Sequence, residues 1–212
     1  MSTAVVVFAR EPVPGEVKTR LAAEAGERVA SRVYSVLLDR TLATAAASSF
    51  DLVVSLAEAP SRKWSTSLGW RWEVQEGNGL GARMRDAFDR RFGENYDRVI
   101  TIGSDCPSLS PRHLLAARRA LDAHPVVLGP ARDGGYWLVA QKRPGVDLFA
   151  GVPWSSPDTL AATRTRLAAL DIPWIELDIL GDIDTARDLR ETIADSTIDP
   201  DLRRDLRFAG GD

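Results

Sequence analysis

Short runs of apolar, mostly β-branched residues alternate with longer amphipathic segments, and this alternation restricts the fold of the chain more than any other feature. The first run, Thr3–Ala9, is continuous and bounded by charge and proline, which is typical of a central strand covered on both faces. A Pro/Gly loop, an amphipathic segment at Glu27–Ala47 and a second buried run at Asp51–Leu56 follow. Strand, loop, helix and strand in this order predict a βαβ unit.

The same order repeats to residue 193 and predicts an α/β fold with a mostly parallel mixed sheet, flanked by helices on both faces. Ligands of such sheets bind at the carboxyl ends of the strands. One domain, residues 1–194, accounts for the series. The tail, residues 195–212, is either a peripheral helix or partly disordered. Further strands are expected at 70–75, 98–103, 126–129, 136–140 and 174–177, and further helices at 80–92, 111–123, 157–170 and 185–193.

Composition excludes several classes of protein. The 212 residues include 27 Lys and Arg against 30 Asp and Glu, and a formal charge of -3 argues against a sequence-independent nucleic-acid binder. A single Cys leaves no internal disulfide framework. The first apolar run is far shorter than the ~20 residues that cross a bilayer, so we expect a cytoplasmic protein without a membrane partner. The oligomeric state, a homodimer included, stays open.

The loop after the first predicted strand carries the strongest functional signal. Two prolines and Gly15 stiffen it, while Arg10, Lys18 and Arg20 bring three cations to the end of one buried strand. A polyphosphate suits such a loop, because a stiff loop loses little entropy on closing and Arg can donate two parallel hydrogen bonds. The alternative is that these are solvated loop charges.

Asp105 lies just past the end of a later buried strand, where its carboxylate should project into the crevice above the sheet. Mg²⁺ or Mn²⁺ needs only one or two protein carboxylates besides waters and substrate phosphates, so this residue can anchor a metal. Helix capping does not explain Asp105, because Ser110 followed by Pro111 already has the pattern of an N-cap and a first helical residue. We interpret Cys106 as a small buried residue rather than a nucleophile.

Two other segments place acidic residues at strand ends. Asp133 precedes the paired glycines Gly134 and Gly135, which permit a positive φ or the close approach of a ligand, although a hairpin turn explains them equally well. Asp182 and Asp184 precede the last predicted helix. For Asp184 we consider both the N-cap of that helix and a second metal position.

Weaker patterns point elsewhere. Gly77–Ala82 matches the dinucleotide fingerprint formally, but it lies in the third strand–helix unit and lacks the acidic residue expected about 20 residues later, which disfavours an NAD-linked oxidoreductase. His113 and His124 fit neither a zinc-ligand spacing nor a triad, so we interpret them as surface or capping residues.

The motifs together resemble a known family. In order and spacing they are similar to the rSAM/selenodomain-associated, glycosyltransferase-like proteins of the nucleotide-diphospho-sugar transferase (GT-A) superfamily, which are related to 2-phospho-L-lactate guanylyltransferase. The resemblance implies a Rossmann-like GT-A sheet that binds a nucleotide or nucleotide sugar and serves a small-molecule acceptor. It rests on Phe8–Leu21, Gly79–Met84, Gly103–Pro107, Gly129–Trp137 and Asp182–Thr185.

The same resemblance implies roles for the matching residues, although Ser104 and Asp105 do not form the D-x-D of common glycosyltransferases. It implies phosphate or nucleotide binding by Arg10, Gly15, Lys18, Arg20, Gly79, Gly81 and Arg83, substrate binding by Asp133, Gly134, Gly135 and Tyr136, and metal binding by Asp105 and Asp184.

These observations predict a transferase that depends on Mg²⁺ or Mn²⁺, with Lys18 and Asp105 as catalytic residues. Asp105, helped by Asp184, would hold the metal against the nucleotide, while Lys18 and Arg10 neutralise charge on the departing phosphate. We favour glycosyl transfer from a nucleotide-diphosphate sugar. The alternatives are a nucleotidyltransferase, guanylyltransferase-like, that releases pyrophosphate from a nucleoside triphosphate, and a non-catalytic nucleotide-binding partner protein.

Overall fold

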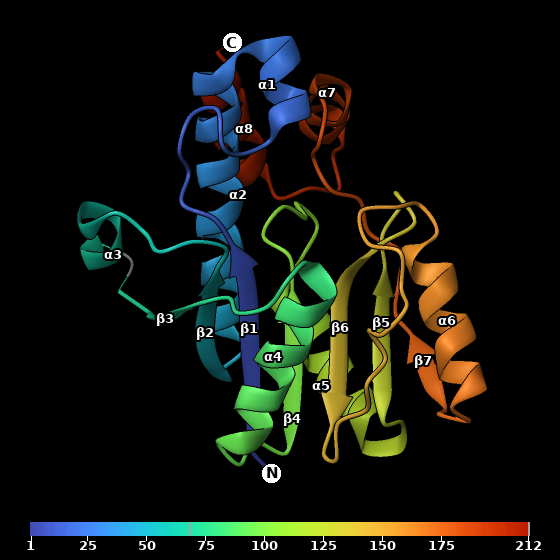
Figure 1. The fold of residues 1–212 in the computed structure, drawn as a ribbon. Helices are drawn as coiled ribbons and strands as arrows, with labels where there is room; N and C mark the ends of the chain where they lie inside the picture. The colour runs from blue at the N-terminus through green and yellow to red at the C-terminus, as the bar shows by residue number, and fades with distance from the viewer. Residues whose placement is uncertain (68, 212) are drawn as a thin grey trace.

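The computed structural model describes residues 1–67 and 69–211, which form a seven-stranded sheet with helices on both faces (Figure 1). Every strand and helix expected from the alternation is present, with ends that shift by one or two residues. The strands are β1 (Thr3–Ala9), β2 (Asp51–Leu56), β3 (Arg71–Val74), β4 (Arg98–Ile102), β5 (Val126–Pro130), β6 (Tyr136–Lys142) and β7 (Trp174–Glu176). The helices are α1 (Thr19–Ala25), α2 (Glu27–Ala47), α3 (Arg62–Ser67), α4 (Leu80–Gly93), α5 (Pro111–Ala123), α6 (Thr159–Ala169), α7 (Ala186–Ala194) and α8 (Pro200–Gly210). The short helices α1 and α3 were not expected.

The strand order, β3-β2-β1-β4-β6-β5-β7, confirms the mostly parallel mixed sheet. β1 pairs in parallel with β2 on one side and β4 on the other, so that Val5 lies between Leu52 and Ile100. Only β6 runs antiparallel to its neighbours within the described sheet. From β1 the chain adds β2 and β3 on one side of the sheet and then crosses to add β4 on the other side of β1. The carboxyl ends of β1 and β4 therefore form a topological switch point, where ligands of such sheets bind.

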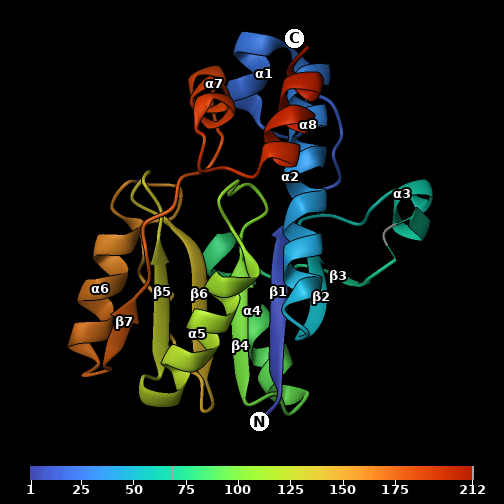
Figure 2. The ribbon, with the colours of Figure 1, turned by 180° about the vertical axis from the view of Figure 1, so that it is seen from behind.

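Alternation along β1 divides the core between the two faces of the sheet. Val5 and Val7 pack with α2 and α5, whereas Val6 packs with α4 and α6. The view from behind shows α2 and α5 on one face (Figure 2). All three valines are fully buried. A strand covered on both faces must be apolar at every position, which explains the continuous run in the sequence.

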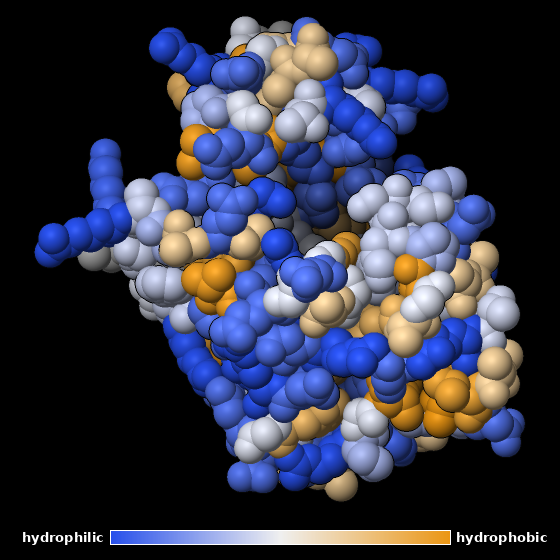
Figure 3. Space-filling model, viewed as in Figure 1, coloured by the Kyte–Doolittle hydropathy of each residue, from blue (hydrophilic) through white to orange (hydrophobic). Residues whose placement is uncertain are grey.

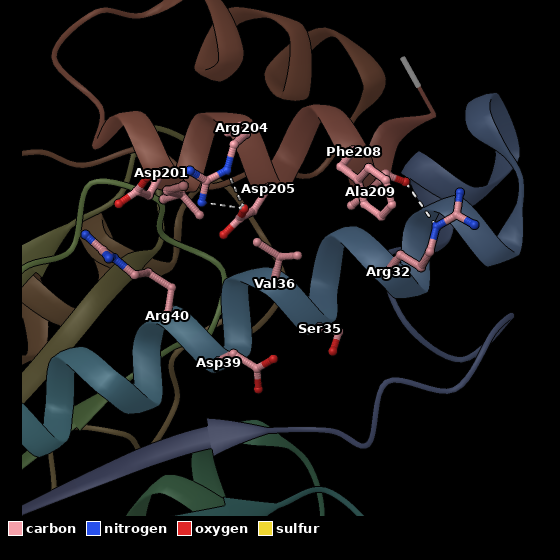
Figure 4. Close-up of a pocket in the computed structure, with 11 residues that line it drawn as sticks. Arg32, Ser35, Val36, Asp39, Arg40, Asp201, Arg204, Asp205, Phe208 and Ala209 are labelled. Atoms are coloured by element: carbon pink, nitrogen blue, oxygen red, sulfur yellow. Dashed lines mark hydrogen bonds and ion pairs between the residues drawn. The ribbon is translucent and has the colours of Figure 1, made fainter.

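A third apolar cluster lies beyond the carboxyl ends of the strands, where α1, the first half of α2, α7 and α8 pack together. Leu21, Ile183 and Leu206, from three different segments, are among its fully buried members. The tail beyond residue 195 therefore contains a packed helix, and α8 lies along α2 with the Nε of Arg32 donating to the carbonyl of Ala209 at 3.2 Å (Figure 4). Among residues 1–67 and 69–211, no helix has the length and apolar character that a membrane crossing requires.

Candidate active site

The loop between β1 and α1 carries Lys18 to the switch point. Lys18 immediately precedes α1 with φ 48° and ψ 51°, a left-handed conformation that costs a residue with a Cβ about 1–2 kcal/mol. Its side chain is 6% exposed, and its Nζ lies 2.8 Å from Oδ2 of Asp105 and 3.7 Å from Oδ1 of Asp184. Strained backbone of this kind persists where the surroundings determine it, and it is common at functional sites.

Asp105 reaches the same point from the loop after β4. Gly103 leaves room for its carboxylate, since a Cβ at Gly103 would lie 3.2 Å from Oδ1 of Asp105. The carbonyl of Asp105 accepts a hydrogen bond from the backbone N–H of Ile183 at 3.2 Å. This bond fastens the segment before α7 to the loop after β4.

Asp182 and Asp184 flank Ile183, which is fully buried in the third apolar cluster. Oδ2 of Asp184 lies 2.9 Å from the guanidinium of Arg20, whose side chain is 76% exposed. The cluster of Lys18, Arg20, Asp105, Asp182 and Asp184 is called the switch-point cluster below. Three segments that are distant in the sequence thus contribute to it: the start of α1, the loop after β4 and the segment before α7.

The capping interpretation of Asp184 is wrong. Thr185 is the N-cap of α7, and its Oγ1 accepts from the backbone N–H of Asp188 at 3.2 Å. The carboxylate of Asp188 accepts in return from the N–H of Thr185 at 2.7 Å, which completes a capping box. Since Thr185 takes this role, the carboxylate of Asp184 pairs with Lys18 and Arg20 instead.

The cluster carries an excess of negative charge around one buried cation. Burial acts to lower the pKa of the Lys18 ammonium, but the attraction of Asp105, Asp184 and Asp182 outweighs burial and holds that pKa above its ordinary value. Burial, followed by the negative charge of Asp105, raises the pKa of Asp182. Lys18 is therefore charged at neutral pH.

The donor atoms of the cluster suit a hard divalent cation, which prefers carboxylate oxygens and is favoured where acidic groups exceed basic ones. Within the described residues no group of three or more His, Cys, Asp or Glu side chains is arranged to hold a metal ion. Instead, the ammonium of Lys18 lies between Asp105 and Asp184. Metal binding by this pair remains a prediction.

Arg10 lies outside the switch-point cluster. Its guanidinium is half exposed and 3.5 Å from the carboxylate of Glu58. Its backbone N–H donates at 3.0 Å to the hydroxyl of Tyr34, a buried residue of α2 that sequence reasoning missed. The same hydroxyl lies 2.9 Å from Oγ of Ser104, so Tyr34 connects the loops after β1 and β4. In the sequence, Tyr34 lies three residues before the apolar Leu37, a spacing that indicates a buried helical face but does not reveal the contacts of its hydroxyl.

Gly79, Gly81 and Arg83 belong to the start of α4, in front of the sheet. Gly79 has φ 84°, and Gly81 lies against the indole of Trp154, where a Cβ would overlap the ring. The Nε of Arg83 donates to the carbonyl of Gly77 at 3.4 Å. Gly79 and Gly81, but not Arg83, line a pocket of about 590 Å³ with Trp154, apart from the residues of the switch-point cluster.

A smaller apolar pocket joins this region to the end of β4. Its volume is about 130 Å³, and Phe8, Leu80, Gly103 and Tyr136 are among its lining residues. Gly103 is two residues from Asp105 in the sequence, but no residue of the switch-point cluster lines this pocket. Flat apolar groups such as a nucleobase or the ring face of a sugar suit a lining of this kind.

The Asp133–Gly135 segment is the turn between β5 and β6, which is one of the two interpretations that its sequence allows. Gly134 has φ 88°, and the N–H of Gly135 donates to Oδ1 of Asp133 at 2.9 Å. Asp133 also lines a pocket of about 500 Å³ together with Arg20, Asp182 and Asp184. The hairpin therefore reaches the switch-point cluster. The molecular surface is hollowed between the group of α1, α7 and α8 and the sheet below it (Figure 3).

Two further expectations are confirmed. Cys106 is buried, and burial raises the pKa of its thiol to about 11, which leaves it protonated and unreactive at neutral pH. His113 is a capping residue, because its Nδ1 accepts from the backbone N–H of Ser110 at 3.1 Å at the start of α5.

The sheet and its helices form a Rossmann-like α/β fold, the fold of the nucleotide-diphospho-sugar transferase superfamily. A crystal structure of a proposed nucleotide-diphospho-sugar transferase from Desulfovibrio desulfuricans G20 is similar, with a TM-score of 0.90 and 29% identity over 98% of this chain and 95% of that one. The chain belongs to the bacterial family described as "Uncharacterized protein conserved in bacteria (DUF2064)", whose model matches residues 37–156.

More distant structures share the fold. CMP:2-keto-3-deoxy-manno-octonic acid synthetase, solved with CTP, has a TM-score of 0.58 and 14% identity over 90% of this chain and 96% of that one. Rv0371c from Mycobacterium tuberculosis H37Rv, solved with manganese, has a TM-score of 0.52 and 17% identity over 90% and 97%. No curated protein matches the sequence.

Proposed function

We propose that the protein is a metal-dependent transferase that takes a glycosyl group from a nucleotide-diphosphate sugar and passes it to a small acceptor. The observation that carries this proposal is the switch-point cluster, in which a buried ammonium and three carboxylates meet at the carboxyl ends of β1 and β4. Opposite charges at this position suit a diphosphate and its cation. The relatives solved with CTP and with manganese support the same ligand class.

Lys18, Asp105 and Asp184 each have a chemical role in this proposal. Lys18 would donate to phosphate oxygens and neutralise the charge that accumulates as the nucleoside diphosphate departs. Asp105 and Asp184 would hold Mg²⁺ or Mn²⁺, which supplies charge neutralisation and alignment of the diphosphate when bound. Arg20 belongs to the cluster and also lines the pocket of about 500 Å³, which has room for the acceptor.

A nucleotidyltransferase is the second candidate, and the loop after β4 favours it. This loop has Ser104 beside Asp105, and Oγ of Ser104 forms a hydrogen bond with the buried hydroxyl of Tyr34. The loop therefore offers one carboxylate, that of Asp105, rather than a pair. A single carboxylate suffices for a metal that is bound mainly by the phosphates of a nucleoside triphosphate. Attack on the α-phosphorus would then release pyrophosphate.

Product analysis separates the two reactions. The protein is incubated with Mg²⁺ or Mn²⁺ and either UDP-, GDP- and dTDP-sugars or the four nucleoside triphosphates, together with a panel of small hydroxyl and phosphate acceptors. Release of nucleoside diphosphate supports glycosyl transfer, and release of pyrophosphate supports nucleotidyl transfer. Nucleotide binding that is independent of metal and unchanged in Asp105→Asn would overturn both and indicate a non-catalytic binding protein.

Matched variants tie the activity to the cluster. Lys18→Met and Asp105→Asn should each lower turnover by about 10²-fold or more, the usual cost of losing one preorganised charged contact. Asp171→Asn is the control, because Asp171 is exposed just beyond the end of α6 and outside the switch-point cluster. Equal activity of all four proteins would contradict the proposed site.

A further inference from the structure

We propose that Lys18 determines the form in which the nucleotide binds. Its ammonium occupies the position between Asp105 and Asp184 and excludes bare metal ions from it, but it moves away when a metal–nucleotide complex binds. This inference rests on the proposed function and specifies its substrate as the preformed metal complex. Lys18 is thus a specificity-determining residue as well as a phosphate ligand.

Geometry gives the first argument. One nitrogen atom, Nζ of Lys18, lies within 3.7 Å of oxygens from both carboxylates. A divalent cation shared by these oxygens would need to stand about 2.0–2.6 Å from each, in the space that Nζ now holds. The ammonium and the metal therefore compete for the same two ligands.

Burial gives the second argument. The side chain of Lys18 is 6% exposed, whereas that of Arg20, the other cation on Asp184, is 76% exposed. Water screens the charge of Arg20, but it screens the charge of Lys18 much less. A bare divalent cation approaching Asp105 therefore meets a weakly screened like charge.

A nucleotide reverses this balance. A metal bound to a diphosphate or triphosphate arrives with negative oxygens that attract the ammonium instead of repelling it. Lys has a flexible four-carbon stem and three donors, so Nζ can turn from Asp105 to a phosphate oxygen while the metal takes the carboxylates. Metal and nucleotide should then strengthen each other's binding by the same factor, as linkage requires.

The test measures Mn²⁺ affinity without any turnover. Mn²⁺ alone is titrated into the wild type and Lys18→Met, with free Mn²⁺ followed by electron paramagnetic resonance. We expect Lys18→Met to bind Mn²⁺ alone about tenfold more tightly, because a close like charge is removed. It should also bind Mn²⁺ with UDP, CDP or GDP more weakly than the wild type. Equal or weaker binding of Mn²⁺ alone by Lys18→Met overturns the proposal.

Controls assign the effect to this position. Arg20→Met removes the exposed cation and should change Mn²⁺ affinity by less than about twofold. Lys18→Met/Asp105→Asn should lose the tighter Mn²⁺ binding, and retention of it would place the metal elsewhere and overturn the proposal. Should Lys18→Met fail to fold, Lys18→Gln takes its place in the Mn²⁺ titration. In addition, Mn²⁺ and UDP, CDP or GDP should raise each other's affinity for the wild type, and the absence of this effect would contradict the inference.

The outcome for the proposed function is read separately. A wild type that binds none of the nucleotides with Mn²⁺ contradicts the transferase proposal. The comparison of Mn²⁺ alone between wild type and Lys18→Met still decides whether Lys18 excludes the bare ion.

Discussion

The ammonium of Lys18 forms a 2.8 Å ion pair with Asp105, 87 residues further along the chain. The pair joins the loops after β1 and β4 at the switch point of the sheet. Its two partners differ in burial, since Lys18 is almost fully enclosed while Asp105 is 37% exposed. The two ends of the pair should therefore respond differently to mutation.

Asp105→Asn should destabilise the fold more than Lys18→Met. The first leaves a buried ammonium without its main anionic partner, at a cost of about 2 kcal/mol, whereas the second removes the buried charge together with its desolvation cost and should cost less than about 1 kcal/mol. Urea unfolding at pH 7 measures the loss in the free energy of unfolding for each variant. The loss in the double variant should be smaller than the sum of the two single losses. Equal losses from the two single variants would contradict this account.

Helix α8 offers a second test, because two of its side chains differ completely in burial. Leu206 is fully buried against the third apolar cluster, while Phe208, two residues later, is 84% exposed. Leu206→Ala should lower the free energy of unfolding by about 3 kcal/mol, the usual cost of removing a buried leucine. Phe208→Ala is the matched control and should change it by less than about 0.5 kcal/mol. Similar effects of both would mean that α8 does not pack as described.

Much of the fold was predictable because its signals are local. The continuous apolar runs of β1 and β4 and the helical period of α2 and α5 are properties of neighbouring residues, and the structure contains all of them. The positions of Lys18 and Asp105 beyond the carboxyl ends of β1 and β4 were predictable for the same reason, since the loop that carries each residue follows an apolar run. Parallel strands then bring such ends to one edge.

The details of the site depend on contacts between distant segments, which local patterns do not contain. Nothing near Lys18 in the sequence shows its left-handed backbone, and nothing near Tyr34 shows that its hydroxyl contacts Ser104. Arg10 follows β1 just as Lys18 does, but it pairs with Glu58 and lies outside the cluster. Asp184 precedes a helix in the sequence, but the adjacent Thr185 has the capping geometry.

The hairpin at Asp133 should be sensitive to a single methyl group. Gly134 and Gly151 both have positive φ, 88° and 76°, so alanine strains the backbone at either position by about 1–2 kcal/mol. At Gly134 the added Cβ would also overlap the carbonyl of Pro157, whereas at Gly151 it would meet open space. Thermal or urea unfolding should show Gly134→Ala to be about 1–3 kcal/mol less stable than Gly151→Ala. Equal losses would contradict the close approach of the hairpin to the segment before α6.

The capping box of α5 should make the fold sensitive to mild acid. Burial, followed by the charge of Arg112, lowers the pKa of His113, whose Nδ1 accepts from Ser110 only when unprotonated. Above about pH 6.5 the ring is neutral in both the folded and unfolded chain. As the pH falls below that value, the unfolded chain takes up the proton first, so the contribution of His113 to stability is lost.

His113→Gln keeps an acceptor at this capping position without a group that titrates in this range. The stability of the wild type relative to His113→Gln, measured by urea unfolding, should therefore be greater at pH 7.5 than at pH 5.5. His124→Gln is the control, because it removes the other histidine and leaves the capping box in place, which separates the loss of a histidine from the loss of the capping contact. A constant difference between wild type and His113→Gln at the two pH values would show that protonation of His113 is not coupled to folding.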